Sequence, residues 1–492
     1  MWKTLGFAIL GLVLVVAGLF ASGYRLALDG SGKVPRFLTR VDFDALEADR
    51  ARQHQMAQAP GAMVDVAPAA MPAPREPQAA GAGGGATTAP SAETASVAPV
   101  KHAAPGAAWA DFRGPNRDGR YTATSIRTIW PREGLPQLWK QPVGGGYASF
   151  VVAGGRAFTI EQRRDQEVVA AYDVQNGREL WTNSWKAYFQ EGMGGDGPRA
   201  TPTYHEGRVY ALGAEGELRA IDAAKGTLVW RHNILAENQA RNVIWGMSAS
   251  PLIVDDKVIV LPGGTRGSSI VAYNKATGDV VWKSLNDEQG YTSPMLVTLG
   301  GVRQILVVSA TRAMGMTIDE GRLLWEYPWS TFNGINVAQP ILFTHNGNDR
   351  MFLSASYGTG AAVVEISRNG DRWQTKKIWD NQRMKNKFSS SVLHDGFVYG
   401  LDESILTCLD VNTGEQKWKG GRYGYGQIML AGGHVIVLAE DGEVVLVRAT
   451  SERHEEVARF QALRGKTWNH PAIADGRLLV RNAQEMAAYK ID

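Results

Sequence analysis

The sequence predicts an all-β protein: an eight-bladed β-propeller closed by a strand from its N-terminal side. Three observations lead to this fold class. A hairpin phrase ending in Trp is repeated along the chain, its Trp recurs about every 46 residues, and one Trp strand precedes the first complete hairpin. Periods of roughly 40–50 residues with four strands each are typical of propeller blades.

The repeated phrase is a predicted hairpin. Each copy has a strand ending in Asp or Asn, a tight turn closed by Gly, and a second strand that carries Trp. Glycine supplies the positive φ that such a turn needs, and Asp or Asn side chains hydrogen-bond the turn backbone. Full copies occupy residues 171–181, 220–230, 272–282 and 408–418, and a shortened one occupies 317–325.

The number of blades follows from the repeated aromatic position. It is filled by Trp139, Trp181, Trp230, Trp282, Trp325, Trp379 and Trp418, with Phe460 in a degenerate last copy. Before most hairpins stand a strand of small residues, such as 248–252, and a β-branched strand, such as 257–261. Four strands in each of eight periods predict eight blades.

The ends of the repeat array predict how the ring closes. The last period supplies three strands up to Asp492 but no Trp strand after them, whereas Trp139 has a strand but no hairpin before it. We expect the Trp139 strand to complete the C-terminal blade, because closure removes the exposed edges of an open array. The alternative is a set of unrelated hairpins or an open solenoid.

Residues 1–24 are predicted to be a signal anchor or a signal peptide. The uncharged apolar run Leu5–Ala21 is short for a membrane span and long for a signal-peptide core. We favour an uncleaved anchor, but the small residues at 21–23 leave cleavage open. Long domains are exported largely regardless of flanking charge, so the propeller is expected outside the cytoplasm.

Residues 25–108 are predicted to be a tether. The first part, to about residue 55, is polar and compatible with a short helix, and residues 56–106 are rich in Ala, Pro, Gly, Ser and Thr. Such a composition buries too little apolar surface to offset the entropy of ordering, so this part is expected to be disordered. The propeller is predicted to occupy 109–492.

Composition excludes several classes of function. The 492 residues carry a net charge of only +3, which does not indicate a nucleic-acid-binding protein. The single cysteine, Cys408, lies in a predicted strand; it excludes an internal disulfide and a multi-cysteine metal site. We expect a monomeric propeller.

The repeated phrase, Ala-x-Asp-x-x-x-Gly-x-x-x-Trp, resembles the pyrroloquinoline-quinone-type propeller repeat. That repeat occurs in quinoprotein alcohol dehydrogenases and in lipoprotein B of the outer-membrane β-barrel assembly machinery. The motifs Phe112–Gly119 and Pro198–Pro202 resemble a group of exported bacterial propellers with the same repeat. The resemblance implies a quinoprotein-like fold for 109–492, but little about chemistry, because the Trp is a packing device between blades.

Departures from the enzymes favour a protein without a cofactor. The resemblance associates the dehydrogenases with a calcium site of Glu, Asn and Asp, a catalytic Asp and often an adjacent cysteine pair. This chain has only Cys408, and it lacks the long insertions that build the enzymes' lid. We therefore expect pyrroloquinoline quinone (PQQ) with calcium only under the alternative function. The chain also lacks the lipidated cysteine of the assembly lipoprotein.

A binding site is predicted where the chain enters each inner strand, because these positions converge on one face of a propeller near its axis. We call this predicted site the mouth. It comprises Tyr147, Asp196, Arg199, Trp245, Glu288, Tyr291, Asn333, Asn336, Lys385, Asn386, Lys387, Tyr423, Tyr425, Trp468, Asn469 and His470. Aromatic walls with a few polar anchors are typical of binding sites. The alternative is that these groups fill the channel and satisfy one another. No catalytic residue or metal ligand is assigned, since no Ser, Cys or acid is fixed to His470 by spacing.

The sequence thus predicts a non-catalytic propeller that binds a protein partner, or a ligand, in the bacterial cell envelope. It is expected on the periplasmic face of the inner membrane if the anchor is retained, and free in the periplasm or secreted if it is cleaved. The alternatives are a PQQ-dependent dehydrogenase of alcohols or sugars, and a sensor or carrier that binds a small ligand without turnover.

Overall fold

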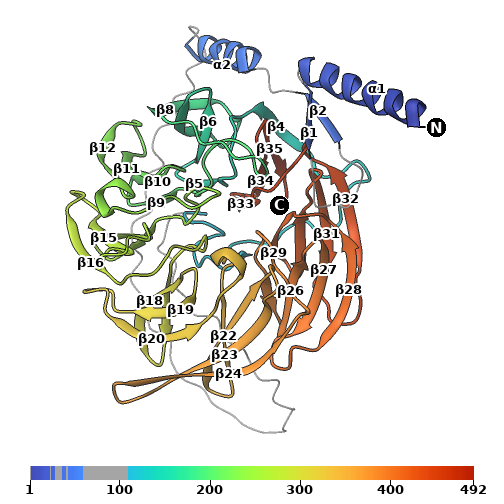
Figure 1. Cartoon of the computed structure of the whole chain (residues 1–492). Helices are drawn as coiled ribbons and strands as arrows, with labels where there is room; N and C mark the ends of the chain where they lie inside the picture. The colour runs from blue at the N-terminus through green and yellow to red at the C-terminus, as the bar shows by residue number, and fades with distance from the viewer. Residues whose placement is uncertain (1, 23, 28–35, 40–42, 59–108) are drawn as a thin grey trace, which may run out of the picture.

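The computed structural model describes residues 2–22, 24–27, 36–39, 43–58 and 109–492, and the last range forms a ring of eight β-sheets (Figure 1). Each sheet contains four antiparallel strands, ordered from the central axis to the rim. The predicted eight-bladed β-propeller is confirmed.

The first four blades follow one another in chain order. Their strands are β5 (Val151–Ala153), β6 (Arg156–Arg163), β7 (Gln166–Asp173) and β8 (Glu179–Lys186) in blade 1; β9 (Thr203–His205), β10 (Arg208–Leu212), β11 (Glu217–Asp222) and β12 (Leu228–Asn233) in blade 2; β13 (Leu252–Val254), β14 (Lys257–Val260), β15 (Ile270–Asn274) and β16 (Val280–Ser284) in blade 3; and β17 (Met295–Leu299), β18 (Val302–Val308), β19 (Arg312–Met316) and β20 (Leu323–Pro328) in blade 4. The short 3-10 helices η1 (Ala236–Asn238) and η2 (Phe332–Gly334) lie between blades.

The remaining blades complete the ring. Their strands are β21 (Ile341–His345), β22 (Asn348–Ala355), β23 (Gly360–Asn369) and β24 (Arg372–Asn381) in blade 5; β25 (Val392–His394), β26 (Phe397–Asp402), β27 (Ile405–Asp410) and β28 (Gln416–Arg422) in blade 6; β29 (Gln427–Ala431), β30 (His434–Leu438), β31 (Glu443–Arg448) and β32 (Glu456–Gln461) in blade 7; and β33 (Ala472–Ala474), β34 (Arg477–Arg481), β35 (Glu485–Lys490) and β4 (Gln137–Pro142) in blade 8. Blade 7 also takes β3 (Arg120–Tyr121) at its inner edge.

The ring closes through strand β4, as the sequence predicts. This strand pairs antiparallel with β35 and places Trp139 opposite Ala488. Both ends of the range 109–492 therefore contribute to the same region of the ring, and the outer edge of the last blade is supplied from the N-terminal side.

The turn of each repeat is stabilised by its acidic or amide residue. In blade 2 the Oδ1 atom of Asp222 accepts hydrogen bonds from the backbone N–H groups of Ala224, at 2.9 Å, and Lys225, at 2.8 Å. Gly226 then adopts a φ of 74°, in the left-handed region that favours glycine. The structure therefore confirms the hairpin predicted from the phrase.

The repeated Trp joins one blade to the next. Trp230 donates from Nε1 to the backbone oxygen of Lys275 in the hairpin of blade 3, at 3.1 Å. Its ring lies on Gly278, where a Cβ atom would come within 3.0 Å of the indole. The same pairing of a Trp with the turn glycine of the following hairpin occurs at Trp139 and Gly177, Trp181 and Gly226, Trp282 and Gly321, and Trp379 and Gly414. The glycine is thus needed both for its φ and for the close approach of the ring.

Three positions depart from this arrangement. Trp418 donates to the backbone oxygen of Thr450, at 2.7 Å, in a hairpin without the phrase. Trp325 donates instead to Oε1 of Gln304 in its own blade, at 2.6 Å; the turn glycine of the following blade's longer hairpin, Gly370, has no atom within 4 Å of its Cβ position. Phe460 has no N–H group to donate and packs its ring against Tyr489, 4.9 Å away between centroids.

The hydrophobic core lies between the blades. One cluster, for example, combines Tyr210 and Leu218 of blade 2 with Val258 and Tyr273 of blade 3, and all four side chains are buried. Each sheet is covered on both faces by its neighbours, so most central strands are apolar throughout. Cys408 is buried in β27 as part of this packing.

Two helices and a short hairpin precede the propeller. They are α1 (Trp2–Ala21), β1 (Tyr24–Ala27) paired with β2 (Arg36–Thr39), and α2 (Phe43–Gln58). In the ranges that the structure describes, no helix combines enough length with enough hydrophobicity to cross a membrane. The helix α2 matches the short helix expected in the polar stretch. Met56–Gln58, predicted to begin the disordered part of the tether, instead end this helix. The rest of that part, 59–106, lies outside the described residues.

The segment Trp109–Tyr121 lies inside the ring (cyan in Figure 1). Trp109 forms a bridge with Val152 in the inner strand of blade 1. Strand β3 pairs in parallel with β29, with Arg120 opposite Leu430. We call Trp109–Tyr121 the axial segment.

Candidate functional site

The connections from each outer strand to the next inner strand lie together at one end of the axis, as the propeller geometry predicts. Neighbouring connections are hydrogen-bonded: the N–H of Tyr147 donates to Pro198, at 2.8 Å, and that of Tyr291 to Asn336, at 2.8 Å. We call this end the loop face. The opposite end, where the turn after each inner strand lies, is the turn face.

Four aromatic side chains of the loop face form one cluster. The ring of Trp468 lies 5.3 Å from that of Tyr147 and 4.5 Å from that of Phe388. Phe388 in turn contacts Tyr425, 5.0 Å away. These side chains come from the connections before blades 1, 6, 7 and 8, so the cluster joins four blades. We call Tyr147, Phe388, Tyr425 and Trp468 the aromatic collar.

Two lysines lie on the collar. Lys387 places its Nζ 4.4 Å from the ring centre of Tyr425 and 3.0 Å from its hydroxyl. Lys466 lies 4.1 Å from the ring centre of Trp468 and donates to the backbone oxygens of Met193, at 3.1 Å, and Gly194, at 3.0 Å. Burial lowers the pKa of Lys466 to about 8, an effect that nearby carboxylates oppose. A cation against an aromatic face gains electrostatic stabilisation when partly desolvated.

Arg199 extends the collar towards blade 2. Its guanidinium lies 4.5 Å from the ring centre of Phe189 and 5.4 Å from that of Tyr147. It donates to the backbone oxygens of Gly195, at 2.7 Å, and Gly197. Burial lowers the pKa of Arg199, while Tyr147 and Glu191 act in the opposite direction. Arg199 therefore fastens the connection before blade 2 onto the collar.

Glu440 is the acid within the collar. Its Oε1 accepts a hydrogen bond from Nε1 of Trp468, at 2.8 Å, and its Oε2 accepts one from the backbone N–H of Tyr425, at 3.1 Å. The carboxylate thus fixes the orientation of the indole and of the connection before blade 7. Held rings and a fixed acid make the collar a pre-organised surface, which lowers the entropic cost of binding.

Trp245 and Tyr291 form a second aromatic pair, with ring centroids 5.9 Å apart. Burial raises the pKa of Tyr291 to about 12.

Asp196 accepts a hydrogen bond from the hydroxyl of Tyr188, at 3.0 Å. Lys385 forms an ion pair with Asp402, at 3.4 Å. Glu288 and Asn333 are exposed. All of these sequence-predicted residues lie on the loop face but outside the collar.

Four predicted mouth residues are buried: Asn336, Asn386, Asn469 and His470. The side chains of the three asparagines are hydrogen-bonded within the protein. Asn336, for example, donates to three backbone oxygens, of Ser309, Ala310 and Trp329, at 2.8–3.1 Å. The ring of His470 packs edge-on against Phe112, and burial holds the pKa of this histidine well below its usual value. These four side chains hold the connections in place, which is the alternative interpretation of the mouth.

Tyr423 also turns away from the axis. Its hydroxyl lies 2.8 Å from Nε2 of His454, and burial raises the pKa of Tyr423.

Sequence reasoning missed Phe189, Phe388, Glu440 and Lys466. Two of them had a signal in the sequence: Phe388 directly follows Lys387, and Lys466 stands two residues before Trp468.

Large apolar side chains are exposed on three connections of the loop face. Tyr188 and Met193 lie before blade 2, Ile244 before blade 3, and Phe332 before blade 5; Ile244 and Phe332 are 66% and 71% exposed. These side chains stand on three separate connections of the same face. The loop face therefore combines the aromatic collar with apolar side chains open to solvent.

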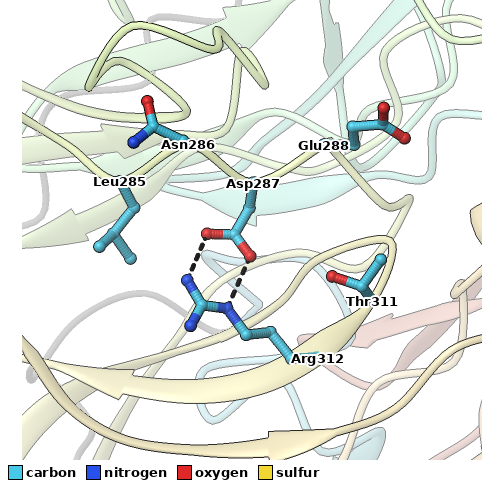
Figure 2. A pocket seen from close by; sticks show the side chains of 6 residues that line it. All are labelled: Leu285, Asn286, Asp287, Glu288, Thr311 and Arg312. Atoms are coloured by element: carbon cyan, nitrogen blue, oxygen red, sulfur yellow. Dashed lines mark hydrogen bonds and ion pairs between the residues drawn. The ribbon is translucent and has the colours of Figure 1, made fainter.

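A cavity of about 410 Å³ lies between the connection before blade 4 and strand β19 (Figure 2). Asp287 and Arg312 face each other across it through two hydrogen bonds of 2.7 Å. Arg312 also pairs with Glu326, and Glu288 lies at the edge of the cavity. Because the guanidinium of Arg312 already forms ion pairs with Asp287 and Glu326, we interpret the Asp287–Arg312 pair as a structural link between the connection and the blade.

A metal site of His, Cys, Asp or Glu ligands needs several of these side chains close together. Within the described ranges, no group of three or more His, Cys, Asp or Glu side chains is placed to hold a metal ion. Burial raises the pKa of the Cys408 thiol to about 12, so this side chain behaves as a small apolar group.

The closed ring of eight four-stranded blades joined by Trp residues defines a quinoprotein-like β-propeller. A family model described as outer membrane protein assembly factor BamB matches residues 164–420. The chain belongs to this family.

Individual relatives point to two kinds of protein. The outer membrane protein assembly factor BamB of Burkholderia pseudomallei is 24% identical over 379 residues, which cover 67% of this chain and 92% of that protein. The 1-butanol dehydrogenase (cytochrome c) of Thauera butanivorans is 33% identical over 101 residues, but these cover only 20% of this chain and 14% of the enzyme. The solved quinohemoprotein alcohol dehydrogenase ADHIIG of Pseudomonas putida HK5 has a TM-score of 0.57 at 14% identity, covering 79% of this chain and 80% of its own; that likeness shows the fold alone.

Proposed function

We propose that this chain is a non-catalytic propeller of the bacterial cell envelope that docks a partner protein on its loop face. The observation that carries the proposal is that the apolar side chains of Ile244 and Phe332 are both exposed on the face that holds the aromatic collar. Aromatic and cationic side chains in a partly desolvated rim are the usual sources of interface energy.

The comparisons support a protein partner over a small substrate. The relative that aligns over most of its own length is named an outer membrane protein assembly factor, whereas the dehydrogenase aligns over a small part of its length. We therefore propose a role in the assembly of outer-membrane proteins, with an envelope protein as the partner. We place the propeller in the periplasm; an inner-membrane anchor at residues 1–24 remains a prediction from the sequence.

Binding on the loop face is tested with two exposed positions and a matched control. The changes Ile244→Ser and Phe332→Ser remove apolar side chains from the loop face, and Ile129→Ser removes one that is 86% exposed on the turn face. We expect the first two to weaken partner binding about tenfold or more, because such side chains each contribute about 1–2 kcal/mol. Melting temperatures should stay unchanged, since all three side chains are solvated.

The readouts are co-purification of the envelope partner with the tagged full-length chain and the amount of outer-membrane proteins in cells that carry each variant. Both should fall with Ile244→Ser and Phe332→Ser and be unaffected by Ile129→Ser. Equal loss with the control would contradict docking on the loop face.

A second candidate, supported by the dehydrogenase relatives, is PQQ-dependent oxidation of alcohols or sugars. Purified protein with added PQQ and calcium is assayed for dye-linked oxidation of a panel of alcohols. We expect none, because the chain has a single cysteine, Cys408, and lacks the long insertions that build the enzymes' lid. Turnover that disappears on changing Asp196 or Asn386 would favour the enzyme.

A further inference from the structure

The inner strand of each blade is an edge strand, so backbone groups that face the axis have no partner within their own sheet. Such groups need other donors or acceptors when they are buried. The axial segment provides several. The N–H of Val152 donates to Trp109, at 2.8 Å, that of Tyr204 to Ala110, at 2.8 Å, and that of Leu430 to Gly119, at 2.8 Å. The segment thus satisfies inner strands of blades 1, 2 and 7.

Arg117 reaches the start of two more inner strands. Its guanidinium is 2% exposed and donates to the backbone oxygens of Ser250, at 3.1 Å, Pro251, and Pro294, at 2.7 Å. These oxygens lie just before the inner strands of blades 3 and 4. The charge is balanced within the segment, since Arg117 also pairs with Asp111 at 2.6 Å. A guanidinium presents several donors in a fixed plane, which suits a cradle of carbonyl oxygens.

Arg113 and Phe112 extend the contacts to two further blades. Arg113, also 2% exposed, donates to the backbone oxygens of Ser391, at 2.8 Å, and Ser390, at 3.4 Å, at the start of blade 6. Phe112 packs edge-on against His470 before blade 8, with centroids 5.0 Å apart. Seven of the eight blades therefore touch one segment of thirteen residues.

We propose that the axial channel is a binding site for an arginine-bearing peptide loop, and that Trp109–Tyr121 is its resident ligand, bound in cis. The contacts that hold the segment are made with residues from 43 positions away (Trp109 to Val152) to more than 300 positions away (Gly119 to Leu430), so they have the character of a peptide bound in a preformed site. The covalent link mainly raises the local concentration of the segment. This site lies within the ring and is separate from the loop face proposed to dock a partner.

The site recognises its ligand through two guanidinium groups, one aromatic ring and backbone pairing. The inner strands supply carbonyl oxygens for the guanidinium groups, Val152 pairs with the backbone of Trp109, and His470 supplies an edge for Phe112. A lysine in place of Arg117 would be a point charge with fewer, differently directed donors. The proposal therefore requires arginine rather than any cation.

A cut placed after the segment tests the proposal in the folded full-length chain. Residues 122–125 are exposed, so a specific protease site is introduced there, the protein is folded, and the chain is then cleaved. We expect the N-terminal fragment to stay bound to the propeller through native chromatography. A fragment that separates as soon as the chain is cut would overturn the proposal.

Specificity is tested on the same cut protein with synthetic peptides, so no variant propeller has to fold. An excess of the 109–121 peptide should displace the N-terminal fragment, whereas the peptide with Arg117→Lys should need at least tenfold more. The matched control peptide carries Arg120→Ala, since the Arg120 contact to blade 7 is made by its backbone, and it should displace as well as the native peptide. Equal displacement by the Arg117→Lys peptide, or none by the native peptide, would contradict the proposal.

Discussion

The packing of the repeated Trp on the turn glycine of the next blade gives a quantitative prediction at Gly321. This residue has a φ of 65°, and a Cβ atom there would lie 2.6 Å from Cε3 of Trp282. Gly321→Ala should therefore carry two costs: about 1 kcal/mol for the left-handed backbone, and about 1–3 kcal/mol for overpacking against the indole.

The two costs separate when the indole is removed. Trp282 is buried and donates to Ile318 at 3.0 Å, so Trp282→Ala alone should cost about 3–5 kcal/mol. In that background Gly321→Ala should cost only the backbone term of about 1 kcal/mol. The coupling between the two changes is then about 1–3 kcal/mol, as for residues in contact.

Urea unfolding followed by circular dichroism measures each free energy. The control is Gly301→Ala, because Gly301 has a φ of 74° with no atom near its Cβ position. Its cost should be about 1 kcal/mol with or without Trp282. If Gly321→Ala costs no more than the control, or costs the same in both backgrounds, the packing account of the repeat is wrong.

Three further predictions concern closure, pH and domain organisation. Trp139→Ala should lower the free energy of unfolding by about 3–5 kcal/mol in urea, because Trp139 is buried in the closing strand; an unchanged midpoint would show that closure by β4 is dispensable. Burial raises the pKa of Glu167 from 4.5 to about 7, so the folded state binds this proton more tightly than the unfolded state does. The protonated side chain therefore contributes stability that is fully present below about pH 4.5 and is lost as the pH rises through 7. Glu167→Gln should therefore gain stability relative to the parent between pH 5 and pH 8, and an equal difference at both values would contradict the assignment. Limited proteolysis should cut first within the predicted Ala-, Pro- and Gly-rich stretch, about 56–106, and release a propeller that begins near Trp109; earlier cleavage within the blades would contradict the boundary.

The fold was predictable because its determinants are local and repeated. The turn phrase places Asp222, Gly226 and Trp230 within one hairpin, and the same spacing recurs around the ring. Closure followed from an unmatched strand before the first repeat and a last repeat that lacked its fourth strand. The departure at Trp325 was not predictable, because its partner Gln304 lies in its own blade and outside the phrase.

The candidate site was predictable in position but not in orientation. Propeller topology places 385–387 on the loop face, yet Asn386 is buried while Lys387 lies on the aromatic collar. Neighbours in a connection without regular structure have no periodicity from which burial can be inferred. The role of Arg117 was missed for a related reason: its partners are 133 and 177 residues away in sequence, and no repeat links them.

The most direct test of docking on the loop face is site-specific photo-crosslinking in living cells. A photoreactive amino acid replaces Ile244 or Phe332 on the loop face, and, as the matched control, Ile129 on the turn face. The docking account predicts one discrete crosslinked envelope protein from both loop-face positions and none from Ile129. Crosslinks from Ile129 alone, or none from Ile244 and Phe332, would contradict it.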